Sequence, residues 1–169
     1  MTSGPSFPHG LRSDEAIQAL VRECGGACVF LRHARAGLPR RESSDWDIAV
    51  QDAAMVGAVV EKLFGPPVAK IERLYVIQRF YPWGQVDLLP DFLVNGCRFL
   101  DQESFWQAVV LGDDGIPRPS LMHDAYLAWM TGVLTGGRYN DRYDDFIRAA
   151  VVSDPAAFRN CLDHAFGKA

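Results

Sequence analysis

Residues 43–50 read Ser-Ser-Asp-Trp-Asp-Ile-Ala-Val, and this short stretch decides how the rest of the chain is interpreted. Side chains in a β-strand alternate between two faces, so Asp45 and Asp47 point the same way, about 7 Å apart along the strand. The apolar residues between and after them take the opposite face, which predicts a strand that packs on a core. Two carboxylates on one edge repel each other, and a hard divalent cation such as Mg²⁺ resolves that conflict.

A second segment, residues 85–89, places one more carboxylate among apolar residues. It reads Gln-Val-Asp-Leu-Leu, and Asp87 alternates with its apolar neighbours as in a strand. A carboxylate in such surroundings is costly to bury without a partner. If this strand lies beside the strand 46–50, three carboxylates converge in a way that suits two-metal chemistry on phosphates. Exposed strand faces often carry alternating charges. Taken without Asp87, the pair Asp45 and Asp47 could therefore also belong to a solvated strand face.

The remaining patterns predict an α+β fold. Apolar stripes predict helices that start near Ser13 and Asp52. Strands are predicted over 27–31, 46–50, 68–71, 74–81 and 85–89, the last two joined by a hairpin turn. Three helical patterns follow Pro90. The order predicts a mixed β-sheet core flanked by helices, residues 1–95, and a C-terminal helical region, residues 96–169, packed on the core as a second domain or as part of one.

Composition excludes several classes of protein. The chain has 169 residues, 49% of them apolar and 22% charged, with a net charge of −4. This apolar content is too high for a disordered chain. A chain with a negative net charge is not a polycation of the kind that binds nucleic acid non-specifically. No stretch has the roughly 20 apolar residues of a membrane-spanning helix, and the start has no pattern of a signal peptide. We therefore expect a cytoplasmic protein that has no membrane partner and whose main role is not the non-specific binding of nucleic acid.

A basic segment precedes the first carboxylates. Residues 32–44 have no apolar period and contain Gly and Pro, which predicts a loop. Its arginines, Arg32, Arg35, Arg40 and Arg41, lie just before Asp45 in the sequence. Guanidinium groups suit phosphate oxygens, so this loop is a candidate phosphate-binding segment. A solvated basic loop is the alternative.

Taken as an ordered set, these segments resemble the nucleotidyltransferase superfamily with the DNA polymerase β-type fold. That family has a strand, a short phosphate-binding turn, a variable loop, a D-x-D strand and a later strand with a third Asp. Here Asp45 and Asp47 match the D-x-D pair and Asp87 matches the third carboxylate. The resemblance covers roughly residues 27–90, and the length and helical tail are similar to those of small bacterial members, including antibiotic nucleotidyltransferases.

The resemblance implies an activity and a set of site residues. The enzyme would move a nucleoside monophosphate from an NTP, with ATP the expected nucleotide, to a hydroxyl of an acceptor. The expected acceptor is a small molecule such as an aminoglycoside or a sugar, and a protein side chain or a nucleic-acid end is the alternative. Two Mg²⁺ (or Mn²⁺) ions would be held by Asp45, Asp47 and Asp87, and Asp87 would also help to deprotonate the acceptor hydroxyl. The residues that would contact the nucleotide are Arg32, His33, Arg35 and Ser44.

One departure from the family pattern supports a second interpretation. The family usually has Gly-Ser just after the first strand, where backbone N–H groups and the hydroxyl hold phosphates. This chain has Leu31-Arg32-His33 there. Either charged side chains replace those contacts, or the chain is a non-catalytic relative that binds a nucleotide or a protein partner. A hydrolase that uses the same carboxylates, with water as the acceptor, is a third possibility.

Three further side chains carry weaker expectations. Tyr81 and Trp83, at the predicted hairpin turn, could stack on a base or an acceptor, but packing in the core is the preferred interpretation. His123 lies off the apolar stripe of its helix and is expected at the surface.

Overall fold

The computed structural model describes residues 13–32, 45–94, 96–134 and 141–167. The described residues divide into two units. The first comprises residues 13–31, 45–91 and 111–117, and the second comprises Arg32 with the described parts of 92–110 and 118–167. The expected Arg32 to Ser44 loop therefore lies outside the described residues, apart from its first residue.

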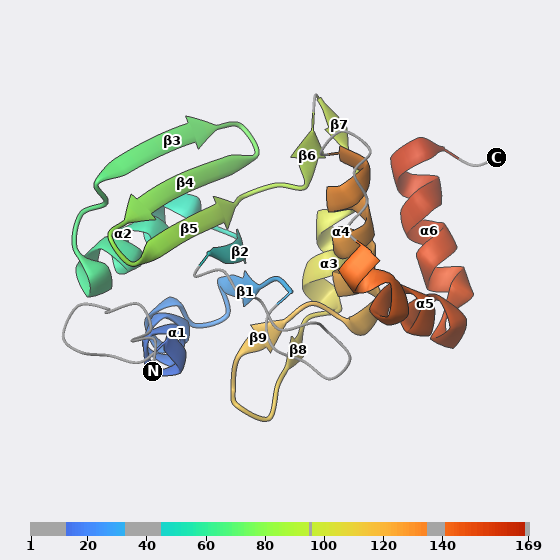
Figure 1. Ribbon diagram of the computed structural model, residues 1–169, viewed down its shortest axis with the longest axis horizontal. Coiled ribbons are helices and arrows are strands. Elements are labelled where there is room, and N and C mark those ends of the chain that lie inside the picture. Colours follow the sequence, from blue (N-terminus) through green and yellow to red (C-terminus); the bar gives the residue numbers. More distant parts are fainter. Residues whose placement is uncertain (1–12, 33–44, 95, 135–140, 168–169) are drawn as a thin grey trace. The chain divides into compact units, whose positions relative to one another are not determined.

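A five-stranded mixed sheet organises the first unit (Figure 1). In chain order its elements are α1 (Ser13–Cys24), β1 (Cys28–Phe30), β2 (Trp46–Val50), α2 (Ala53–Phe64), β3 (Ala69–Arg73), β4 (Val76–Tyr81) and β5 (Gly84–Leu89). The strand order is β1-β2-β5-β4-β3. β2 and β5 pair in parallel, and the other neighbouring strands pair antiparallel. The predicted α+β class with a mixed sheet is confirmed.

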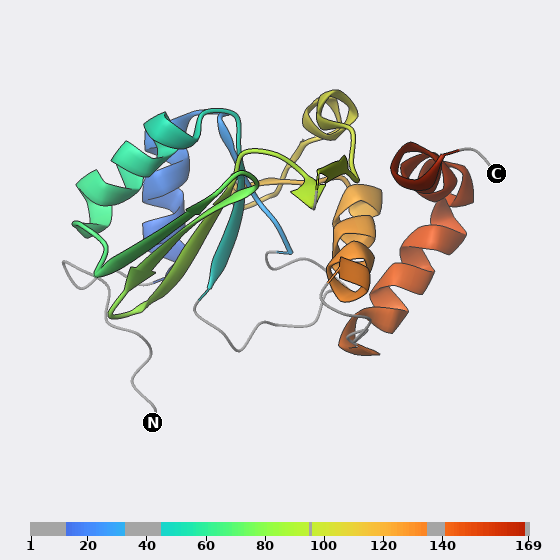
Figure 2. The same ribbon diagram turned by 90° about the horizontal axis from the view of Figure 1, so that it is seen from above.

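The core of this unit lies between the sheet and its two helices. Helices α1 and α2 lie together on one face of the sheet, as Figure 2 shows. The sheet contributes alternate apolar side chains to that face, among them Ile48, Val86 and Leu88, each completely buried. The helices contribute their apolar stripes, including Leu20 and Val60. The period-two pattern of the strands therefore leaves the intervening polar residues on the opposite face.

The ends of α2 follow from its sequence. The Asp52 carboxylate accepts a hydrogen bond of 2.9 Å from the Met55 N–H and thereby caps the first turn. Gly65, at φ +81°, ends the helix in a conformation that side chains disfavour. On the face that packs against the sheet, Gly57 has no room for a side chain because the guanidinium of Arg79 occupies that space. Arg79 is almost fully buried and is paired with Glu61 of α2.

The second unit is mostly helical. It contains α3 (Gln102–Gln107), α4 (Leu121–Leu134), a 3₁₀ turn (Asp141–Tyr143), α5 (Asp144–Ser153) and α6 (Pro155–Phe166), together with the short strands β6 (Leu93–Val94) and β7 (Cys97–Arg98). The small strands β8 (Val110–Leu111) and β9 (Pro117–Arg118) pair with each other, and of their residues Leu111 and Pro117 belong to the first unit. The core of α4 and α5 is formed by residues such as Ala125, Ala128, Phe146 and Ile147. The predicted C-terminal helices are thus present.

None of the described helices is both long enough and apolar enough to span a bilayer.

Candidate functional site

The polar face of the sheet carries the carboxylates that the sequence singled out. Asp47 of β2 and Asp87 of β5 are register partners across the parallel pair. Gln78 of β4 is the register partner of Asp87 on its other side. Backbones of neighbouring strands lie about 4.8 Å apart, and residues in register point to the same face. The three side chains therefore form one row across the sheet, on the face opposite α1 and α2.

Main-chain hydrogen bonds fix the end of this row. The N–H of Leu31, just after β1, donates to the carbonyl of Asp47 at 2.9 Å. The backbone of Asp47 is thus held between β1 on one side and β5 on the other. Strands paired on both sides are rigid positions for a functional side chain.

Asp87 is half-buried and held by two amides. The Gln85 Nε2 donates to Asp87 Oδ1 at 2.6 Å. The Gln78 Nε2 lies 3.5 Å from Oδ1 and 3.4 Å from Oδ2 of the same carboxylate. Burial raises the pKa of Asp87, the Gln85 hydrogen bond lowers it, and the negative charges of Asp47 and Asp45 raise it further. The net direction is upward, so this carboxylate holds its proton more tightly than an exposed one.

The donor set fits a hard divalent cation in its chemistry. Asp45, Asp47 and Asp87 offer only carboxylate oxygens, which Mg²⁺ and Mn²⁺ prefer. The pKa of Asp87 is raised chiefly by burial and in smaller part by the negative charges of Asp47 and Asp45, which a cation bound beside them would offset. Among the described residues, no group of three or more His, Cys, Asp or Glu side chains is arranged so that it could hold a metal ion. The carboxylates are therefore neighbours without being a preformed cage.

The predicted nucleotide-binding residues fall mostly outside the described part of the chain. His33, Arg35 and Ser44 lie there. Arg32 is described and belongs to the second unit. Its N–H donates to Asp124 Oδ1 of α4 at 2.8 Å, and Asp124 is completely buried.

Arg32 also has an unusual backbone conformation. Its φ is +50°, the left-handed region that ordinarily favours glycine. Among the described residues it is the one non-glycine residue with positive φ. Arg32 belongs to the run Leu31-Arg32-His33, which stands where the resembled family usually has Gly-Ser. An arginine therefore occupies a backbone conformation that ordinarily favours glycine.

The aromatic residues of the hairpin pack in the core. Trp83 stacks on Tyr81 with ring centroids 4.9 Å apart and lies 5.3 Å from Trp46. Tyr81 and Trp83 are only 6% and 5% exposed. The preferred packing interpretation therefore holds, and these rings have too little free surface to stack on a base.

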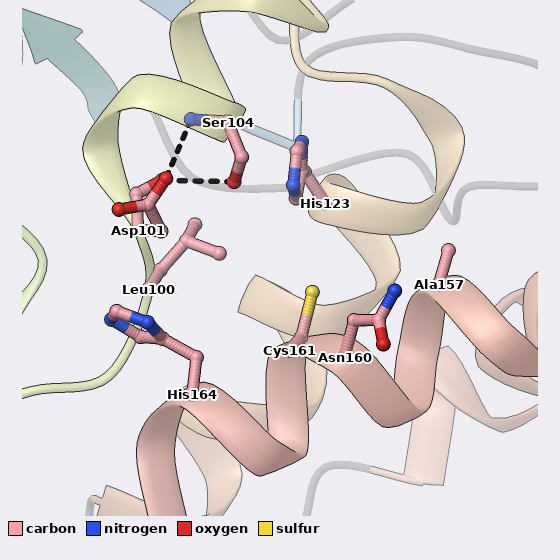
Figure 3. Close-up of a pocket in the computed structure, with 8 residues that line it drawn as sticks. All are labelled: Leu100, Asp101, Ser104, His123, Ala157, Asn160, Cys161 and His164. Carbon is pink, nitrogen blue, oxygen red and sulfur yellow. Dashed lines mark hydrogen bonds between the residues drawn. The ribbon is translucent and has the colours of Figure 1, made fainter.

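A pocket of about 190 Å³ lies in the second unit, next to α3, α4 and α6 (Figure 3). Asn160, Cys161 and His164 of α6 line one side of it, and Asp101 and His123 line the other. Asp101 is engaged as the cap of α3, accepting from the Ser104 N–H at 2.7 Å. Among the described residues that line the pocket, none is a Lys or an Arg.

His123 corrects a sequence-based expectation. It was expected at the surface and is instead 8% exposed, because α4 is buried on nearly all of its sides. Its Nδ1 has no hydrogen-bond partner among the described residues. Burial lowers the pKa of this imidazole, and the charge of Asp101 opposes that shift in part. The side chain is therefore a neutral group in the pocket wall.

Sequence reasoning missed the two glutamines that hold Asp87. A signal for one of them was present, because Gln85 lies two residues before Asp87 in a strand and must share its face. Gln78 could be found only from the register of the β4–β5 hairpin, which depends on its turn.

Comparisons with known proteins bear on the fold. No protein-family model and no curated protein sequence matches the chain. Among solved structures, the chain is similar to the solution structure of the antibiotic-resistance factor ANT(2'')-Ia, for which substrate-regulated conformation dynamics are described. The TM-score is 0.59 at 15% sequence identity, over 88% of this chain and 86% of that one. The chain therefore shares the fold of that protein.

Proposed function

We propose that the protein is a nucleotidyltransferase that moves a nucleoside monophosphate from an NTP, with ATP the expected nucleotide, to a hydroxyl of a small-molecule acceptor. The observation that carries the proposal is the in-register neighbourhood of Asp47 and Asp87 on the face of the sheet opposite the helices. The shared fold with ANT(2'')-Ia, an aminoglycoside nucleotidyltransferase, supports a small acceptor.

Each carboxylate has a role in this proposal. Asp45, Asp47 and Asp87 would hold Mg²⁺ or Mn²⁺, which supplies positive charge to the phosphate oxygens when bound. Asp87 accepts the proton of the acceptor hydroxyl, and the amides of Gln85 and Gln78 hold its carboxylate in place for that role. The acceptor oxygen forms a bond to the α-phosphorus, the bond between the α- and β-phosphates breaks, and pyrophosphate leaves. Arg32, with His33, Arg35 and Ser44, would bind phosphate oxygens.

Release of pyrophosphate tests the proposal. The protein is mixed with each of the four NTPs, Mg²⁺ or Mn²⁺, and a panel of hydroxylated acceptors that includes aminoglycosides and sugars. We expect release that depends on both metal and acceptor and that is lost in Asp87→Asn. Metal should also raise the melting temperature, because a ligand that binds only the native state stabilises it. Absence of both the release and the metal-dependent stabilisation would contradict the proposal.

A specific observation favours a second candidate, a non-catalytic relative that binds a nucleotide or a protein. Leu31-Arg32-His33 stands where the resembled family usually has Gly-Ser, and the described carboxylates are not a preformed metal site. This candidate predicts NTP binding, measured by calorimetry, without release of pyrophosphate under any of the conditions above.

A further inference from the structure

The outer edge of β3 is an exposed surface that the proposed function does not use. All five residues of this strand are exposed. It is the last strand of the sheet, and in the described part of the chain no strand pairs with its outer side (Figure 1). Val68, just before the strand, and Leu74, just after it, are 71% and 78% exposed. Apolar side chains at both ends of an unpaired edge strand are typical of a surface that another strand covers.

The turn after β3 determines which main-chain groups face outward. Arg73 and Val76 close the β3–β4 hairpin with Leu74 and Tyr75 as a two-residue loop. In such a hairpin the closing pair is hydrogen-bonded, and bonded residues alternate along an antiparallel ladder. The residues bonded to β4 are therefore the odd-numbered ones. The N–H and C=O groups of Lys70 and Glu72 point away from the sheet.

The sequence of the edge is complementary to itself in the antiparallel direction. Residues 68–74 read Val-Ala-Lys-Ile-Glu-Arg-Leu. If two copies meet at Ile71, Lys70 of one copy lies opposite Glu72 of the other, and the reverse pair forms as well. In the same register Val68 comes next to Leu74 of the second copy. In this register the main chains of Lys70 and Glu72, whose N–H and C=O groups point outward, would form the hydrogen bonds between the two copies. The charged pairs, the apolar contacts and the hydrogen bonds therefore all favour the same alignment.

We propose that β3 pairs with β3 of a second copy of this chain, antiparallel, about a two-fold axis at Ile71. Self-complementarity of this kind is what a two-fold interface requires. Lys70 and Glu72 already form an ion pair of 2.5 Å within one chain. In the pair of strands the four charges would alternate in sign, and each ammonium would gain a second carboxylate.

The alignment has a consequence for the rest of the sheet. Ile71 is the register partner of Gln78, which is itself the partner of Asp87. Ile71 therefore stands on the same face as the carboxylates. Pairing through β3 would join two five-stranded sheets into one continuous sheet of ten, with both pairs of carboxylates on one face. The proposal does not depend on the catalytic proposal, because it uses neither Asp47 nor Asp87.

The expected association is weak. One pair of edge strands buries less surface than a stable dimer needs, so we expect a dissociation constant of about 10⁻⁵ to 10⁻⁴ M. The charged pairs are exposed, so association should weaken as salt is added.

Charge reversal tests this proposal, with association measured by sedimentation equilibrium of the full chain. Protein concentrations from about 10 µM to 1 mM span the expected dissociation constant. Lys70→Glu and Glu72→Lys each place like charges opposite each other twice. Each variant alone should associate at least about tenfold more weakly than the natural chain. Mixed in equal amounts, they should associate as well as the natural chain does, because every Glu then faces a Lys. The double variant Lys70→Glu/Glu72→Lys should associate normally.

Arg159→Glu, an exposed change on α6 with the same effect on net charge as Lys70→Glu, serves as the control and should associate normally. A natural chain that stays monomeric up to the highest concentration would overturn the proposal and leave the edge to solvent or to a different partner. Association that is unchanged in both single variants, or that is not restored by mixing them, would also overturn it.

Cross-linking tests the register. In a chain with Cys97→Ser, which removes the exposed one of the four cysteines, Ile71→Cys should form an intermolecular disulfide with oxidised glutathione. Opposite residues of a non-hydrogen-bonded pair are close enough for such a bond. Ala69→Cys is the matched control, since Ala69 faces Arg73 of the second copy. Equal cross-linking of both variants would reject the alignment at Ile71.

Discussion

Asp47 and Asp87 lie opposite each other across the one parallel strand pair of the five-stranded sheet. Both residues lie inside the paired parts of their strands, so their side chains stay close together while the sheet is intact. Burial raises the pKa of Asp87 most, and the negative charge of Asp47 raises it in addition.

Asp87→Asn should affect stability and activity in opposite directions. The folded chain holds the Asp87 proton more tightly than the unfolded chain does, so the charged carboxylate lowers the free energy of unfolding at pH values above its raised pKa. The loss is relieved as pH falls towards the ordinary value for Asp. The amide removes this pH dependence and should stabilise the metal-free protein at pH 7, while nucleotidyl transfer falls by about 10²-fold or more.

Urea unfolding from pH 4 to 8, together with the pyrophosphate assay, measures both effects of this change. Asp113→Asn, an exposed change of the same chemistry, should alter neither quantity. An Asp87→Asn protein that is both less stable and fully active would remove Asp87 from the mechanism.

The two glutamines should differ in their influence on Asp87. Gln85 donates at 2.6 Å and Gln78 at 3.4–3.5 Å, so the shorter hydrogen bond stabilises the charged carboxylate more. Gln85→Met should therefore raise the pKa of Asp87 further, and Gln78→Met should do so less. Carbon-detected NMR titration of the Asp carboxyl groups reads this order directly, and the reverse order would show that the hydrogen bonds differ from those described.

Arg32 should respond to substitution through its backbone as well as its charge. A side chain in the left-handed region costs about 1 kcal/mol relative to glycine. Arg32→Gly should therefore unfold at a higher denaturant concentration than Arg32→Ala, in contrast to the usual order of glycine and alanine. Under the proposed function both variants bind NTP more weakly than the natural chain, and Arg32→Lys retains part of the affinity. Calorimetry measures the binding, and equal NTP affinity in all four proteins would exclude Arg32 from the site.

His123 should make the protein less stable in mild acid. Burial lowers its pKa in the folded state, so the unfolded chain takes up the proton first. Stability is unaffected at pH values above the ordinary histidine value of about 6.5 and is lost as pH falls below it. His123→Gln removes that part of the pH dependence, which thermal unfolding between pH 7.5 and 5.5 measures. His164→Gln, at the edge of the same pocket, is the matched control and should retain the acid sensitivity of the natural chain.

The faces of the strands could be predicted from the sequence, but their neighbours could not. The alternation in residues 45–50 and 85–89 fixes which side chains share a face, since the period of a strand is two residues. The parallel pairing of β2 with β5 depends on packing between distant segments, so the convergence of Asp47 and Asp87 remained conditional until the structure was known.

Two local errors have physical causes. The strand predicted over 74–81 begins at Val76, because Leu74 and Tyr75 form the β3–β4 turn although both are residues that strands favour. The surface position expected for His123 assumed a helix with one apolar stripe, whereas α4 is buried on most sides and also places Asp124 in the interior.

The parallel pairing of β2 with β5 also sets the order in which the protein can become functional. Asp87 follows Asp47 by 40 residues, and α2, β3 and β4 lie between them in the chain. Contacts between segments so far apart form late, since a large loop must close before they can be made. The β3–β4–β5 meander can form from local contacts while the carboxylates are still apart. Affinity for a divalent cation should therefore arise only in the last stage of refolding, and a metal-sensitive probe would time the completion of the sheet.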